Sequence, residues 1–167
     1  DLATLFTGRT VEVKVYPFSF KEYLLYHGIT DGFDRAFDEY VRSGGMPGSY
    51  PYKSEDRRYA YIQDVYETVL VRDLVDKYHI RNQQEFVNIA EFMMDNIGNL
   101  LSANNISTAL NHNDSDITRK TVAKYIDYLE NAFLFYEAKR YDLKGKKYLA
   151  RNSKYYLCDA AFRYAVN

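Results

Sequence analysis

The sequence has little of what catalytic, metal-binding and membrane-spanning proteins commonly use. It contains one cysteine, three histidines and no tryptophan among 167 residues. A single thiol, Cys158, cannot form an internal disulfide, which predicts a reducing, cytoplasmic location. The histidines are scattered without zinc-ligand spacing, and no apolar run approaches the roughly 20 residues needed to cross a bilayer. We therefore expect no metal site and no membrane contact.

Motifs of common active sites are also absent. The sequence has no phosphate-binding Gly-x-x-x-x-Gly-Lys-Ser/Thr loop, no Gly-x-Ser-x-Gly elbow and no His-Glu-x-x-His pair. Cys158 lies in an apolar run and is best interpreted as a small buried hydrophobic residue. We predict that the chain has no complete active site and binds no cofactor by itself. Because it begins at Asp1 rather than Met, we expect it to be part of a longer chain.

Positive charge is concentrated in one short segment. The formal net charge is −1, yet residues 139–154 carry seven lysines and arginines against one acid, Asp142. The rest of the chain is therefore acidic. An asymmetry of this kind attracts an anionic partner.

The spacing of apolar residues predicts a mainly α-helical fold with a small β hairpin. Apolar residues at steps of three and four predict helices after Ser19, Asp31 and Ser54, which are all suitable N-cap residues. The helix after Ser54 is expected to run without interruption to about His79. Alternation of apolar and polar residues over 11–16 predicts a strand before the first helix.

From residue 83 the pattern changes to three helices followed by two strands. The second and third of these helices are expected to begin after Ser102 and Thr118, and a charged turn separates the strands. This order is that of a winged helix-turn-helix. We therefore divide the chain into a helical region, 1–82, and a winged-helix domain, 83–167.

Two groups of polar side chains, most of them basic, form the predicted nucleic-acid-binding surface. In a helix-turn-helix the second helix of the motif enters the major groove, and here that is the helix after Thr118. Helical spacing places its apolar residues on one side and its cations on the other. Lysines at the tip of the hairpin would neutralise phosphates. The candidates are Arg119, Lys120, Thr121 and Lys124 on the helix, and Lys144, Lys146, Lys147 and Arg151 on the hairpin.

The same residues allow other interpretations. Lysines at the edge of a hairpin also block unwanted strand pairing, and Asp127 and Glu130 on the helix would repel DNA. Contact with double-stranded DNA or RNA, docking onto another protein, and simple solvation of the surface therefore remain open. Winged helices serve both of the first two roles, because fold does not fix function.

Acidic side chains are frequent on the helix predicted over 54–79. Paired carboxylates can perform acid–base chemistry, but these alternate with basic residues at ion-pair spacing. We interpret them as an exposed, salt-bridged face. They are Asp64, Glu67, Asp73 and Asp76, and the basic residues are Arg72 and Lys77.

Four segments together resemble one known family. They are LATLFTGRTVEVKVYPFSFKEYLLYHG, YVRSGGMPGSY, YIQDVYETVLVRDLVDKYHIRN and KYYLCDAAFRYAV. In these segments the sequence is similar to AAA-type ATPases that carry the C-terminal domain called DUF4143. The resemblance implies that 1–16 end the ATPase core, that 17–82 form its helical lid region and that 83–167 form the winged helix.

The resemblance also implies a function. The parent protein would use ATP and Mg²⁺, whereas this fragment lacks the loop that binds them. Arg9 is similar to an arginine just past the sensor region of such ATPases, which could reach a γ-phosphate, although an ordinary strand-leading arginine is the preferred interpretation. The expected function is a winged-helix nucleic-acid-binding module of an AAA-type ATPase, without enzyme activity of its own. The alternative is a module that docks onto the ATPase core or another protein without contacting DNA.

Overall fold

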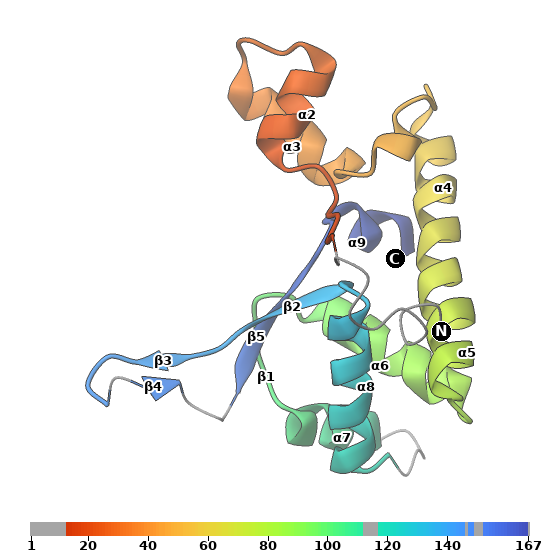
Figure 1. Ribbon diagram of the computed structural model, residues 1–167, viewed down its shortest axis with the longest axis vertical. Coiled ribbons are helices and arrows are strands. Elements are labelled where there is room, and N and C mark those ends of the chain that lie inside the picture. Colours follow the sequence, from red (N-terminus) through yellow and green to blue (C-terminus); the bar gives the residue numbers. More distant parts are fainter. Residues whose placement is uncertain (1–12, 112–116, 146, 149–151, 167) are drawn as a thin grey trace.

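A computed structural model shows a mainly helical chain with a small antiparallel sheet, as the apolar spacing predicts (Figure 1). The structure describes residues 13–111, 117–145, 147–148 and 152–166. Three of the predicted site residues, Arg9, Lys146 and Arg151, lie outside these ranges. Within them, no helix is both long enough and apolar enough to span a membrane.

The N-terminal half consists of helices. In chain order they are α2 (Phe20–His27), α3 (Phe33–Ser43), the 3-10 turn η1 (Pro47–Ser49), α4 (Glu55–Glu67), the π-helix η2 (Thr68–Leu74) and α5 (Val75–Tyr78). The α2–α3 pair projects from one end of the molecule, whereas α4, η2 and α5 form one long rod (Figure 1). The sequence predicts this rod as a single α-helix, and that prediction is wrong over η2, where the backbone widens into a π-helix.

The helix starts agree only in part with the expected caps. Ser19 is the N-cap of α2 as expected and forms a capping box with Glu22, in which the Ser19 N–H donates to the Glu22 carboxylate at 2.8 Å. Asp31 does not cap α3, because Gly32 occupies the N-cap position in a left-handed conformation. Ser54 is the N-cap of α4, but its side chain makes no capping hydrogen bond.

The strand predicted over 11–16 is wrong for the part that the structure describes. Val13 and Val15 are 77% and 85% exposed, and residues 13–16 belong to neither sheet. The alternating pattern is present, but among the described residues no strand lies beside it to share backbone hydrogen bonds. Alternation indicates a strand only where a partner strand completes the ladder.

The C-terminal half combines helices with two small sheets. Its elements are α6 (Gln83–Asp95), β1 (Leu100–Leu101), α7 (Ala103–Asn111), α8 (Arg119–Asn131), β2 (Phe135–Ala138), β3 (Tyr141–Asp142), β4 (Lys147–Tyr148), β5 (Ser153–Leu157) and α9 (Ala161–Val166). One antiparallel sheet has the order β1-β5-β2, and β3 pairs with β4 nearer the tip of the same hairpin. The sequence predicts the hairpin but not β1, whose two residues are too few to show an alternating pattern.

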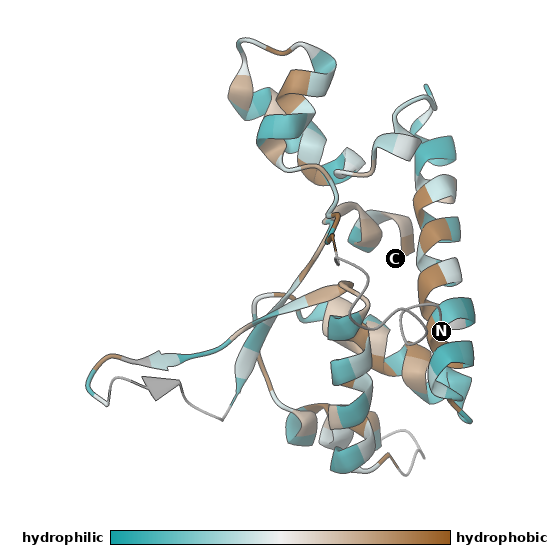
Figure 2. Ribbon diagram, viewed as in Figure 1, coloured by the Kyte–Doolittle hydropathy of each residue, from teal (hydrophilic) through white to brown (hydrophobic). Residues whose placement is uncertain are grey.

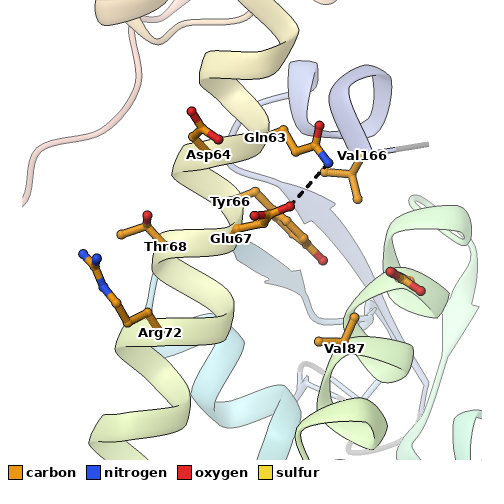
Figure 3. Close-up of a pocket in the computed structure, with 9 residues that line it drawn as sticks. Gln63, Asp64, Tyr66, Glu67, Thr68, Arg72, Val87 and Val166 are labelled. Carbon is orange, nitrogen blue, oxygen red and sulfur yellow. Dashed lines mark hydrogen bonds between the residues drawn. The ribbon is translucent and has the colours of Figure 1, made fainter.

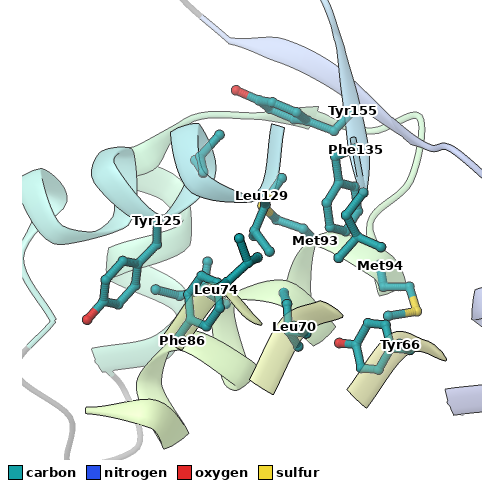
Figure 4. Close-up of a cluster of buried hydrophobic side chains, with 14 of the residues drawn as sticks. Tyr66, Leu70, Leu74, Phe86, Met93, Met94, Tyr125, Leu129, Phe135 and Tyr155 are labelled. Atoms are coloured by element: carbon teal, nitrogen blue, oxygen red, sulfur yellow. The ribbon is translucent and has the colours of Figure 1, made fainter. Parts of the chain in front are cut away.

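A single apolar core joins the long rod to the C-terminal half (Figure 4). Leu70 of η2, Phe86 of α6 and Leu129 of α8 are fully buried in it, and the sheet contributes Phe135. The core thus draws residues from both sides of position 82. The division into 1–82 and 83–167 stays a prediction.

A buried carboxylate connects two distant parts of the chain. The side chain of Asp159, which is 4% exposed, accepts hydrogen bonds from the N–H of Gly45 at 2.8 Å and of Ala161 at 3.0 Å. Gly44 has φ of 76°, and a Cβ at that position would collide with the Asp159 carboxylate. Burial raises the pKa of Asp159, and the two backbone hydrogen bonds oppose that rise. The loop after α3 is thereby fixed against the start of α9.

Candidate nucleic-acid interface

Helix α8 is the predicted recognition helix, and its orientation is fixed by a cap and an apolar side. The Thr118 hydroxyl accepts a hydrogen bond from the Thr121 N–H at 3.1 Å, as expected for an N-cap. Val122, Ile126 and Leu129 are buried in the core. Because these residues recur at steps of four and three, the opposite side of α8 must face outward.

The outward side of α8 carries three cations in its first half. Arg119, Lys120 and Lys124 are exposed, and within the described ranges no carboxylate lies within 4 Å of their charged groups. Thr121 is half-buried, and its hydroxyl shares a hydrogen bond with that of Thr118 at 2.9 Å. Three of the four residues predicted on this helix therefore point their charge into solvent.

Lys124 borders a cleft that sequence analysis did not predict. Its ammonium group lies 5.5 Å from the centre of the Tyr128 ring, which stacks on Tyr78 with centroids 3.6 Å apart and planes 5° from parallel. The cleft has a volume of about 380 Å³ and is also lined by His79 and Arg81. A second cation, Arg81, is thus brought beside Lys124 from a segment more than forty residues earlier. No local pattern could have shown this.

Arg119 lies in a different hollow from Lys124. This second polar pocket, also of about 380 Å³, is lined by Asn104 at the start of α7 and by Glu137 and Ser153 of the sheet. Glu137 is already engaged there, because it accepts a hydrogen bond from the Ser153 hydroxyl at 2.6 Å and pairs with Lys139 at 3.3 Å. The cations of α8 therefore extend along two neighbouring surfaces rather than one.

The second half of α8 has the opposite electrostatic character. Glu130 is half-buried, and burial, with repulsion from Glu137 and Asp127, raises its pKa to about 6. These carboxyl groups disfavour any polyanion over the C-terminal half of the helix. An anionic partner would have to approach near Arg119, Lys120 and Lys124.

The hairpin extends away from the helices (Figure 1). Lys144 is exposed near its tip, and Lys147 occupies β4 opposite Asp142. The side chain of Lys147 lies outside what the structure describes. The described backbone thus shows a projecting ribbon with Lys144 near its end.

Neither a metal site nor an activated thiol is found in the described part of the chain. No group of three or more His, Cys, Asp or Glu side chains there is close enough to hold a metal ion. Burial raises the pKa of Cys158 to about 12, with the Asp159 charge adding to the rise. This thiol therefore stays protonated near neutral pH, which does not suit a nucleophile.

Comparison with known families decides the family membership. The model of DUF8612, a domain of unknown function, matches residues 34–167. The chain belongs to the DUF8612 family. The resemblance to AAA-type ATPases with a DUF4143 domain is therefore wrong, since neither of those families matches. Its loose motifs, mostly turns and amphipathic helices, do not discriminate between helical families. The resemblance was the basis for expecting ATP and Mg²⁺ in the parent protein and a phosphate-sensing role for Arg9. These expectations therefore lose their basis.

Two curated relatives cover this DUF8612 chain almost completely. An uncharacterized protein of Haemophilus influenzae is 35% identical over 166 residues, which are 98% of this chain and 41% of the relative. An uncharacterized protein of Methanocaldococcus jannaschii is 22% identical over 177 residues, covering 100% of this chain and 40% of the relative. The chain thus spans about two fifths of the length of these relatives. No solved structure matches it.

Proposed function

We propose that this chain is a nucleic-acid-binding module of the winged-helix type, with α8 as its recognition helix. The order α6, β1, α7, α8, β2, β5 and the sheet order β1-β5-β2 support this finer description of the fold. The hairpin between β2 and β5 would be the wing. Double-stranded DNA is the proposed partner, because α8 is a capped helix with one exposed side, of a size that fits a major groove.

The observation that carries the proposal is the exposed positive charge on the first half of α8. Lys120 and Lys124 are exposed without a carboxylate within 4 Å among the described residues, and Arg81 lines the same cleft as Lys124. Exposed cations such as these can each contact a backbone phosphate. Each such contact releases condensed counterions, so binding would depend steeply on salt.

Fluorescence anisotropy with a labelled DNA duplex tests this proposal. We expect the double substitution Lys120→Ala/Lys124→Ala to weaken binding about tenfold or more. The plot of the logarithm of the association constant against the logarithm of the salt concentration has a negative slope, and its magnitude should decrease by about two. Arg81→Ala should decrease that magnitude by about one more. The titrations run between about 50 and 200 mM salt, where the difference is largest.

Lys53→Ala is the matched control, because Lys53 is equally exposed but lies in the turn before α4. It should leave both the affinity and the slope unchanged. If wild type shows no binding at the lowest salt, or if the control loses as much affinity as the α8 variant, the proposal is wrong.

The α2–α3 pair favours a second candidate, docking onto another protein. Leu25, Phe33 and Phe37, on α2 and α3, are 72%, 50% and 49% exposed. The projecting pair carries several hydrophobic segments (Figure 2). Large exposed apolar groups that lie close together commonly mark interaction sites. Absence of DNA binding, with concentration-dependent sedimentation that Leu25→Ser/Phe33→Ser abolishes, would favour this candidate with a second copy of this chain as the docked protein.

A further inference from the structure

A further cavity lies between the rod and α6, and the α8 cations do not line it (Figure 3). Its volume of about 680 Å³ is within the range of small-molecule pockets. Its walls come from α4, η2, α6 and the end of α9. The residues are Gln63, Asp64, Tyr66, Glu67, Thr68, Arg72, Val87, Glu91 and Val166.

Tyr66 contributes a buried hydroxyl without a partner to this cavity. The residue is 4% exposed, and its phenol oxygen makes no hydrogen bond among the described residues. Its ring packs on Phe162 of α9 with centroids 5.8 Å apart, which holds it in place. Burial raises its pKa, and the negative charge of Glu91 adds to that rise. A buried polar group without a hydrogen bond lowers the stability of the folded protein. The presence of such a group at Tyr66 therefore points to a ligand that supplies the missing hydrogen bond.

The backbone beside Tyr66 is also unusual. The π-helix η2 begins at Thr68, which lines the cavity as well. π-helical turns are rare and are frequently found at functional sites, because the widened turn costs stability. This backbone feature is independent of the unpartnered hydroxyl and lies at the same place.

The charge of the lining defines the ligand. The lining includes three acidic side chains, Asp64, Glu67 and Glu91, and one basic side chain, Arg72. Arg72 lies 3.8 Å from Asp73, outside the lining, so part of its charge is already matched. The sequence predicts several ion pairs along this helix. Among the described residues of the rod, only Arg72 and Asp73 form one. The cavity is therefore negatively charged.

We propose that this cavity binds a small organic cation, with an ammonium or guanidinium group next to an apolar stem. The cationic group donates hydrogen bonds to the Tyr66 hydroxyl oxygen and to the Glu91 carboxylate. The stem lies against Val87 and Val166. The exposed side chains of Gln63 and Glu67, which share a hydrogen bond of 3.4 Å, also line the cavity.

Isothermal titration with agmatine, which joins a guanidinium to an amine through four carbons, tests this proposal. We expect saturable binding at or below about 1 mM, weakened about tenfold by Tyr66→Phe and by Glu91→Gln. Tyr66→Phe should at the same time raise the melting temperature of the ligand-free protein, since it removes an unsatisfied buried hydroxyl. A purely structural tyrosine would not show both effects.

Asp56→Asn is the control, because it removes an exposed charge from the same helix outside the cavity. It should change agmatine affinity by less than about twofold. Arginine blocked at both ends serves as the second probe. If it binds more tightly than agmatine, the ligand is a protein side chain and the proposal is wrong. No saturation by about 10 mM agmatine, or equal losses in all three variants, would also overturn it. DNA binding by α8 does not depend on either outcome.

Discussion

Glu130 is the residue whose ionisation the fold opposes most clearly on α8. Its pKa rises from 4.5 to about 6, mainly through burial and then through repulsion by Glu137 and Asp127. Because the folded pKa exceeds the unfolded one, the folded state holds the proton more tightly. The free energy of unfolding therefore falls as pH rises from about 4.5 to about 6. Above that window the lost stability is constant.

The corresponding prediction concerns Glu130→Gln. This variant should be more stable than wild type at pH 7 by about 1 kcal/mol, a value reduced because the carboxyl is partly exposed. The difference should vanish at pH 4.5, where the wild-type carboxyl is protonated. Urea unfolding of both proteins at the two pH values measures it. A difference that is the same at both pH values would show that Glu130 does not titrate in this way.

Between elements, Asp159 is the polar contact with the largest expected effect. It joins the loop after α3 to the start of α9 through the N–H groups of Gly45 and Ala161. Asp159→Asn keeps the size but replaces one acceptor with a donor that faces another donor. We expect a loss of about 1–3 kcal/mol in the free energy of unfolding, measured in urea. Asp127→Asn, an exposed change of the same kind, should cost less than about 0.5 kcal/mol. Equal costs would contradict this role.

The sequence predicts those elements whose signal lies in residues a few positions apart. Ser19 and Thr118 cap their helices as expected, because a cap involves residues only three positions apart. The π-helix η2 has no such local signal, because its apolar residues have the spacing of an ordinary α-helix. The two residues of β1 form a strand only because β5 lies beside them. Elements that depend on a distant partner could not be predicted from spacing.

Across the whole molecule, the candidate site follows the same rule. Helical spacing alone places Lys120 and Lys124 on the outward side of α8, where the structure has them. The cleft with Arg81 and the stacked Tyr78 and Tyr128 requires α5 to pack beside α8, and tertiary packing decides that. The family resemblance failed for a related reason, because amphipathic helices and turns recur in unrelated helical proteins.

The shared core predicts how the molecule unfolds. Phe162 of α9 is 2% exposed and packs on Tyr66 of α4, so it connects the rod to the last element of the chain. Phe162→Ala should lower the free energy of unfolding by about 3–5 kcal/mol. Because one core spans both halves, we expect a single transition in which circular dichroism and tyrosine fluorescence change together.

Leu143→Ala is the control, because Leu143 is 82% exposed on the hairpin, and its cost should stay within about 0.5 kcal/mol. Two separate transitions in Phe162→Ala, with the second at the wild-type midpoint, would mean that residues 83–167 fold independently. The division at residue 82 would then describe a folding boundary. A single shifted transition would instead make the rod and the C-terminal half one cooperative unit, in which a ligand bound beside Tyr66 stabilises α8 as well.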